Sequence, residues 1–474
     1  MKGRVPVAAI GSTVVAVLLF AGCVETERVF VEVPSYENPP SAAAGFLGYT
    51  NSSSKLPVCG NCHIGQHAKW QNTAHANAWD DLQASGHATE SCEGCHSVGS
   101  NGNFVTDALV GYAATRDERY HDVQCESCHG PGLEHVTNPD ATQPLASLLV
   151  GTGLANGCGE CHQGTHTPFI EEWSASRHSN TGNSASTRAE CASCHEARGI
   201  FAAWGLGVEY IERTDPGVIP ITCAVCHDPH DARNPKQLRF PIDVPNVETN
   251  LCMKCHHKRA TPDAESNSRA PHSPQGPLLI GEDVGWVPPN FQYPTLQIVG
   301  THGTEANPRL CATCHVTRLE VTDAATGEFV FQATGHLFKA IPCLDAQGLP
   351  TTDDSCDVTQ RSFAGCAASG CHTETSARSA LVVARTRIAS LTSQVTNLLA
   401  QVPASEFVNN DYLITTAEGA RFNRDLGNQA GSPIHNPFLV EALLTASIVQ
   451  LRTEYGLTVP ADLVLENVLG AAIQ

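Results

Sequence analysis

The sequence predicts a fold of mostly coil and short α-helices around bound cofactors, with a C-terminal pair of long α-helices and little β-structure. Three observations indicate this. A Cys-x-x-Cys-His motif recurs along the chain, charged and aromatic residues make up only 16% and 6% of 474 residues, and glycine and proline are frequent. A chain with so few large side chains needs cofactors to fill its core, and its glycines and prolines favour irregular structure.

The motif indicates which cofactor is bound. Two cysteines three positions apart lie on one face of a helical turn, where both can form thioethers with one haem, and the next histidine can face the iron. Eight copies occur, numbered here as sites 1 to 8 in chain order. They are Cys59, Cys62 and His63; Cys92, Cys95 and His96; Cys125, Cys128 and His129; Cys158, Cys161 and His162; Cys191, Cys194 and His195; Cys223, Cys226 and His227; Cys252, Cys255 and His256; and Cys311, Cys314 and His315. One copy alone could equally be half of a zinc site, but eight copies that all end in histidine favour haem c.

A ninth site is expected at Cys366, Cys371 and His372, where four residues instead of two separate the cysteines. The additional residues must bulge, but both sulfurs can still reach one porphyrin. The alternative is a disulfide that uses Cys366, with Cys343 and Cys356 as nearby partners. If site 9 binds haem, 18 of the 21 cysteines belong to haem sites and a Cys343–Cys356 disulfide is predicted. We therefore expect a multihaem cytochrome c fold with nine haems, or eight if site 9 is not one.

The spacing of the sites predicts an internal repeat. The first five motifs begin at a constant step of 33 residues. The segment 59–67 matches 158–166, and Trp70 and Trp173 each stand five residues before a histidine. The expected divisions are a three-haem unit at 56–157, a second at 158–250, a third haem region at 251–376 and a C-terminal helical segment at 377–474.

Distal haem ligands are sought among the other histidines. Nine of the 22 histidines belong to the motifs, so 13 remain for nine irons. The repeat selects candidates that have a counterpart in both units: His67, His75, His135, His166, His178 and His230. For the last three haems the candidates are His272, His302, His336 and His435, and a second tier comprises His87, His121 and His257. The sequence does not assign a particular histidine to a particular iron.

The N-terminus predicts export. Lys2 and Arg4 precede an apolar run at 5–20 that ends in Leu-Phe-Ala-Gly before Cys23, as in a lipoprotein-type signal peptide at 1–23. The prediction is a lipid on Cys23 that attaches the protein to a membrane, followed by a polar tether at 24–55. The alternative is an ordinary signal peptide. Either places the protein in the periplasm, on the outer membrane, on the cell surface or outside the cell. The formal charge of −20 disfavours nucleic-acid binding.

Two C-terminal segments have helical periodicity. Apolar residues from Leu381 to Val402 follow a 3-4-3-4 spacing that stops at Pro403. A second helix is expected from Asn436-Pro437 to Gly456. Packing of these helices against each other is one interpretation, and an interface for self-association is the other.

Several motifs resemble a known family. The segment 124–135 (Gln-Cys-Glu-Ser-Cys-His-Gly-Pro-Gly-Leu-Glu-His) and the segment 70–75 are similar to exported multihaem cytochromes, namely the nitrifier tetrahaem cytochromes and their hydroxylamine oxidoreductase-like and octahaem relatives. This resemblance implies distal roles for His135 and His75, whereas His67 falls where the family often has tyrosine. The segment 432–437 resembles the C-terminal part of cytochrome c nitrite reductases, which implies that His435 is an axial ligand and that the long helices pair subunits.

The function predicted first is the transport of electrons along a series of bis-histidine haems to redox partner proteins and towards an extracellular acceptor. One alternative is an oxidoreductase of nitrite, hydroxylamine or tetrathionate type with one open haem. Relatives of that type often carry Cys-x-x-Cys-Lys, which is absent from this chain, so no catalytic residue is assigned. Another alternative is a subunit of a cytochrome filament, in which a histidine of one subunit ligates a haem of the next.

Overall fold

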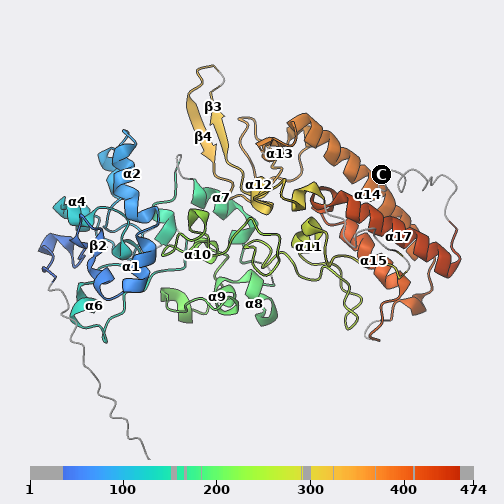
Figure 1. The fold of residues 1–474 in the computed structure, drawn as a ribbon, viewed down its shortest axis with the longest axis horizontal. Helices are drawn as coiled ribbons and strands as arrows, with labels where there is room; N and C mark the ends of the chain where they lie inside the picture. The colour runs from blue at the N-terminus through green and yellow to red at the C-terminus, as the bar shows by residue number, and fades with distance from the viewer. Residues whose placement is uncertain are drawn as a thin grey trace, which may run out of the picture. The chain divides into compact units, whose positions relative to one another are not determined.

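The computed structural model describes residues 36–150, 157–164, 168–182, 184–289, 291, 300–323, 325–368, 370–408 and 411–458. Within these ranges, short helices alternate with coil, and the only sheets are two antiparallel pairs of strands (Figure 1). The expected fold class, mostly helix and coil with little β-structure, is confirmed. The proposed signal peptide and Cys23 lie outside the described residues.

The helices of the haem-site region are short because many are built on the motifs themselves. Helices α5, α10 and α12 begin at the first cysteine of a motif, and α8 ends at the histidine of one. The bounds are α1 Ile64–Trp70, α2 Ala78–Ala84, α3 Glu90–Glu93, α4 Gly111–Thr115, α5 Cys125–His129, α6 Leu133–Thr137, α7 Phe169–Ala175, α8 Ala189–His195, α9 Ala197–Ala203, α10 Cys223–Cys226, α11 Gln275–Ile280, α12 Cys311–His315 and α13 Ala364–Ala368.

The two sheets are local hairpins. Strand β1 (Tyr49–Asn51) pairs with β2 (Leu56–Pro57), and β3 (Leu319–Thr322) pairs with β4 (Phe329–Ala333). In the second hairpin Leu319 lies opposite Ala333, and the tip projects from the body in Figure 1. Its base leads directly into the coil that carries His336.

The two long C-terminal helices form as expected. Helix α14 (Glu374–Leu399) starts at a capping box on Thr373 and ends before Pro403. Helix α17 (Pro437–Tyr455) has Asn436 as its N-cap and Gly456 in the left-handed conformation after its end. The apolar stripes predicted on both helices are buried against each other, with Ile388, Val395 and Leu444 in one cluster. The packing interpretation of these helices is confirmed.

A third helix, α15 (Thr416–Gly427), packs with this pair, together with the short α16 (Ser432–His435). The sequence did not indicate α15, because its buried face includes Gly419 and Gly427 in place of large apolar residues. A β-carbon on Gly419 would lie 2.1 Å from the Trp286 ring, so only glycine admits this indole. Figure 1 shows the three helices side by side.

The described residues of the haem-site region do not form a single protein core. Its buried apolar residues fall into small separate clusters, whereas the largest cluster belongs to the C-terminal helices. Cofactors between these clusters would complete the core. Cys343 and Cys356 form the predicted disulfide, with their Cα atoms 6.0 Å apart. No helix in the described part of the chain is long and apolar enough to cross a membrane.

Candidate functional site

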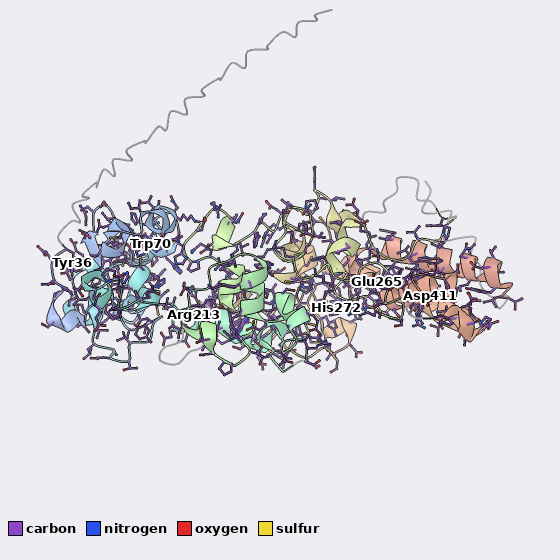
Figure 2. The ribbon with its side chains drawn as sticks, turned by 90° about the horizontal axis from the view of Figure 1, so that it is seen from below. Tyr36, Trp70, Arg213, Glu265, His272 and Asp411 are labelled. Carbon is purple, nitrogen blue, oxygen red and sulfur yellow. A yellow bond between two sulfur atoms is a disulfide. The ribbon has the colours of Figure 1, made fainter. Side chains whose placement is uncertain are left out.

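Eight of the nine motif histidines face a second histidine. Each pair joins one motif histidine to one histidine that the sequence selected as a distal candidate, with ring centroids 6.0–6.4 Å apart. The pairs, motif residue first, are His63 with His135 (6.2 Å), His129 with His230 (6.1 Å), His162 with His75 (6.2 Å), His195 with His272 (6.0 Å), His227 with His336 (6.4 Å), His256 with His178 (6.4 Å), His315 with His435 (6.2 Å) and His372 with His302 (6.2 Å). One of the distal candidates, His272, is labelled in Figure 2 on the coil before α11.

This spacing fits a haem iron between the two rings. With metal–nitrogen bonds of about 2.0 Å and ring nitrogens about 1.1 Å from each centroid, an iron separates two centroids by about 6.2 Å. Imidazoles in direct van der Waals contact would be closer, and unrelated histidines would show no constant distance. The paired side chains therefore lie at the separation expected of two axial ligands of one iron. Site 9 has the same spacing as the other sites, despite its longer loop between cysteines.

The internal repeat places two of the distal candidates in the same way. The indole Nε1 of Trp70 donates to the carbonyl of Val123 (3.1 Å), and that of Trp173 donates to Ile221 (2.8 Å). The backbone N–H of Val123 donates in turn to the carbonyl of His75, and the backbone N–H of Ile221 to that of His178, both at 3.1 Å. Each network ties a distal candidate to the residue two positions before a motif cysteine, so the two units are built alike around these histidines.

Hydrogen bonds orient the imidazoles. The Nδ1 atoms of six site histidines lie 2.6–2.9 Å from backbone carbonyls, to which they can donate. The six are His96 (to Ala78), His129 (to Pro144), His135 (to Thr142), His227 (to Lys236), His302 (to Ile434) and His315 (to Phe338). An Nδ1 proton held by a carbonyl leaves Nε2 unprotonated for a metal, which is the usual arrangement of a ligating histidine.

Burial favours the neutral form of three of the paired imidazoles. Burial, together with the smaller effect of neighbouring imidazoles, lowers the pKa of His75 and of His178 to about 4 and that of His435 to about 3. A cation in such surroundings loses its hydration without gaining a counter-charge. The neutral imidazole is also the form that binds a metal, so the surroundings prepare these residues for ligation.

Five of the 13 distal candidates, and the motif histidine His96, are not part of the eight pairs. His96 of site 2 has no second histidine among the described residues, and the candidate His166 lies outside them. The structure does not bring His67 to another imidazole within the described ranges. Its Nε2 lies 3.1 Å from the Lys55 carbonyl, and its ring lies 6.1 Å from that of Trp70. The second-tier His121 instead stacks on Trp79, with centroids 4.0 Å apart.

Two known families match stretches of the sequence that contain these sites. Residues 58–130, which contain sites 1 to 3, match the family described as cytochrome c554 and c-prime. Residues 220–261, which contain sites 6 and 7, match the family of doubled Cys-x-x-Cys-His motifs. The chain is a multihaem c-type cytochrome. The part of the prediction that concerns haem c binding is thereby confirmed.

Two relatives match parts of the cytochrome. The C-type polyheme cytochrome OmcC of Geobacter sulfurreducens is 27% identical over 205 residues, which cover 35% of this chain and 25% of OmcC. The multiheme cytochrome MtrA of Shewanella baltica is 23% identical over 195 residues, which cover 36% of this chain and 54% of MtrA. The matched part thus spans about a quarter and about half of these relatives. No solved structure matches the chain.

Neighbouring sites of the cytochrome are close enough for their cysteines to interact. Thiols of five pairs of sites lie within hydrogen-bonding reach: Cys59 and Cys125, Cys95 and Cys161, Cys158 and Cys223, Cys194 and Cys255, and Cys252 and Cys311. At three further pairs of sites the cysteines are near enough to influence each other electrostatically: Cys128 and Cys158, Cys226 and Cys252, and Cys314 with Cys366 and Cys371. These contacts connect sites 1, 3, 4, 6, 7, 8 and 9 in that order. Site 2 adjoins site 4, and site 5 adjoins site 7.

Two phenylalanines contact histidines of several sites in the middle of this series. The Phe338 ring lies 4.5 Å from that of His178 (site 7) and 5.6 Å from that of His336 (site 6), and the Phe338 carbonyl accepts from His315 (site 8). Phe169 likewise contacts His162 of site 4 at 5.7 Å and His336 at 4.8 Å. Neither phenylalanine belongs to a haem motif, and neither was identified from the sequence.

Proposed function

We propose that this cytochrome carries electrons along nine haem c groups, most of them held between two imidazoles. The observation that carries the proposal is the set of eight histidine pairs with nearly constant ring separation. Bound haem c supplies a one-electron iron couple whose potential depends on its axial ligands, hydrogen bonds and burial. Site 9 is included because His372 and His302 are spaced like the other pairs.

The roles of the protein residues follow from their positions. The 18 motif cysteines attach the porphyrins covalently, which fixes the distance between neighbours. Paired imidazoles fill both axial positions, so a substrate has no free coordination position at such a site. The same two ligands in both oxidation states keep structural reorganisation small, which suits transport of electrons and not transformation of a substrate.

The order of the sites supports a relay. The proximity of their cysteines links seven sites in a series from Cys59 to Cys371. An electron that enters at one end of this series therefore meets a neighbouring site at each step. Site 2 lies beside site 4 and site 5 lies beside site 7, so these two sites are branches of the series.

Export and partner binding are part of the proposal. The protein acts in the cell envelope, attached to a membrane through a lipid on Cys23, and exchanges electrons with redox proteins or an extracellular acceptor. The Cys343–Cys356 disulfide supports an oxidising compartment outside the cytoplasm. Mass spectrometry of the mature N-terminus tests the anchor, since a diacylglycerol adduct on Cys23 is expected and an unlipidated chain cleaved elsewhere contradicts it.

The finer family likeness is proposed on two observations. The match of residues 58–130 supports kinship with nitrifier tetrahaem cytochromes, and the pairing of His435 with His315 supports the likeness of segment 432–437 to cytochrome c nitrite reductases.

The deciding experiment combines haem counting with spectroscopy of the whole mature protein. Mass spectrometry is expected to give nine haems, and the ferric protein is expected to show low-spin haem alone. Nitrite, and carbon monoxide after reduction, should leave the spectrum unchanged. A haem that binds nitrite and turns it over would replace the carrier function by an oxidoreductase function.

A further inference from the structure

Among the described residues, two histidines of the eight pairs have a side-chain oxygen within 3.2 Å of Nδ1. The Nδ1 of His230 lies 3.2 Å from Asp228 Oδ1. The Nδ1 of His336 lies 3.1 Å from the hydroxyl of Thr334. The hydrogen bonds at His336 extend to a third residue, because Thr334 in turn donates to a carboxylate from another region of the chain.

That carboxylate belongs to Glu172 on α7, which follows site 4. Three groups at the base of the β3–β4 hairpin donate to it: the backbone N–H of Thr334 (2.6 Å), the hydroxyl of Thr334 (2.9 Å) and the backbone N–H of His336 (2.6 Å). Thr334 is only 3% exposed. Hydrogen bonds to a carboxylate in such a place are stronger than neutral ones.

The direction of these bonds assigns a tautomer to His336. Because the Thr334 hydroxyl donates its proton to Glu172, its oxygen is left to accept one from His336 Nδ1. The Nδ1 of His336 then carries the proton and its Nε2 is free to face the iron between it and His227.

The turn that carries these residues is also fixed by packing. Gly335, between Thr334 and His336, has φ +88°, and a β-carbon there would lie 2.6 Å from the Val316 backbone. The base of the β3–β4 hairpin therefore packs directly against Val316, the residue after His315. The centroid of the His336 ring lies 4.8 Å from that of the Phe169 ring. Among the described contacts, the Glu172 carboxylate is the acceptor for the backbone N–H groups of Thr334 and His336 in this turn.

We propose that Glu172 is a positioning residue for site 6: through Thr334 it orients His336, sets its tautomer and makes it a stronger ligand. This inference rests on the proposed function, because it takes His336 and His227 as the axial pair of one haem. It adds a residue that touches neither the motif nor the iron. An anionic partner behind a ligating imidazole increases the basicity of that ligand, which favours the ferric state.

The test compares matched variants of the whole mature protein, each checked for nine haems. Glu172→Ala and Thr334→Val remove the carboxylate and the hydroxyl. Thr334→Ser keeps a hydroxyl, and Glu171→Gln alters the exposed carboxylate one position away, which accepts only from Gly164 N–H among the contacts described. His336→Ala removes the ligand itself.

We expect His336→Ala to bind carbon monoxide at one more reduced haem per chain than the unaltered protein. Glu172→Ala and Thr334→Val should gain carbon monoxide binding at a fraction of one haem, and one component of the redox titration should move to higher potential. Thr334→Ser and Glu171→Gln should match the unaltered protein in both measurements. If His336→Ala gains a carbon monoxide site but Glu172→Ala and Thr334→Val do not, and their titrations are unchanged, the role of Glu172 is wrong. If His336→Ala itself gains none, the axial pair assumed in the proposed function is wrong.

Discussion

The rings of His75 and His162 face each other with centroids 6.2 Å apart, although His75 follows site 1 and His162 belongs to site 4. The same relation holds one repeat later, where His178, after site 4, faces His256 of site 7 at 6.4 Å. The proposed three-haem units thus exchange imidazoles across their boundaries. His63 of site 1 instead faces His135, which follows site 3. Haem ligation would therefore connect consecutive units.

Replacement of His75 by alanine tests this exchange. The site 4 haem should lose its second ligand although the Cys158–His162 motif is intact, since no other described imidazole faces His162 at this distance. We expect one additional high-spin ferric haem per chain in the electron paramagnetic resonance spectrum. His67→Ala is the matched control, because the His67 Nε2 contacts the Lys55 carbonyl and the variant should keep a low-spin spectrum. A high-spin signal in His67→Ala and none in His75→Ala would reverse the assignment.

Replacement of Cys366 and Cys371 by alanine tests site 9. The chain mass should fall by one haem beyond the mass of the two sulfur atoms, leaving eight haems. His302, whose ring lies 6.2 Å from that of His372, should then lose its iron, but sites 1 to 8 keep all their motif residues. An unchanged haem number in this double variant would show that the ninth motif binds no haem.

The sequence predicted most of the histidines that form the sites, but it did not predict which two histidines form each pair. Repeated local patterns, such as Trp70 and Trp173 five residues before a histidine, marked His75 and His178 because the repeat conserves their backbone hydrogen bonds. The same matching also selected His67, which contacts a carbonyl, since a repeat shows equivalent positions and not their contacts. Pairings such as His129 with His230 depend on how distant segments meet, which spacing along one chain does not determine.

Residues outside the motifs were harder to find. Glu172 lies in an ordinary amphipathic helix, and its partners Thr334 and His336 come from a hairpin far along the chain. Helix α15 was missed because Gly419 lowers helix propensity, and the reason for glycine there is the Trp286 ring, which arrives from another segment. The sequences 228–230 (Asp-Pro-His) and 334–336 (Thr-Gly-His), with a polar side chain two positions before a histidine, are the one local signal that could have suggested the side-chain partners of His230 and His336.

The buried Glu126 should make stability depend on pH. Its carboxylate accepts from the backbone N–H groups of Leu47, Gly48 and Gly132, yet burial raises its pKa to about 7. Because the folded state holds this proton more tightly than the unfolded state, the free energy of unfolding should fall as pH rises from about 4.5 to above 7. The loss attributable to this group is at most about 3 kcal/mol.

The measurement is denaturant unfolding at pH 5 and pH 8, followed by circular dichroism. Glu126→Gln does not titrate, so its stability should fall less between the two pH values than that of the unaltered protein. Glu134→Gln alters an exposed carboxyl on α6 and should keep the original pH dependence. Equal pH dependence in Glu126→Gln and the unaltered protein would mean that Glu126 is ionised in the folded state at both pH values.

The C-terminal helices should contribute a packed core that does not depend on haem. Leu444 is fully buried among α14, α15 and α17, so Leu444→Ala should lower the free energy of unfolding by about 2–5 kcal/mol. Val449 lies on the same helix and is 46% exposed, so Val449→Ala should change stability by about 0.5 kcal/mol or less. Denaturant unfolding of both variants, with nine haems verified in each, measures the difference. Equal stability in the two variants would mean that this helix is not packed as described.

The Cys343–Cys356 disulfide should stabilise the connection between site 8 and site 9 without taking part in haem attachment. It closes a loop with a sequence separation of 13 residues, and the bridge between Cys343 and Arg361 lies beside it. By loop entropy, removal of such a crosslink costs about 3 kcal/mol, because the unfolded chain gains freedom. Cys343→Ser combined with Cys356→Ser should therefore lower the unfolding midpoint but keep nine haems and a low-spin spectrum. Loss of a haem in this double variant would instead mean that one of these cysteines helps to attach the porphyrin at site 9, as an alternative to Cys366.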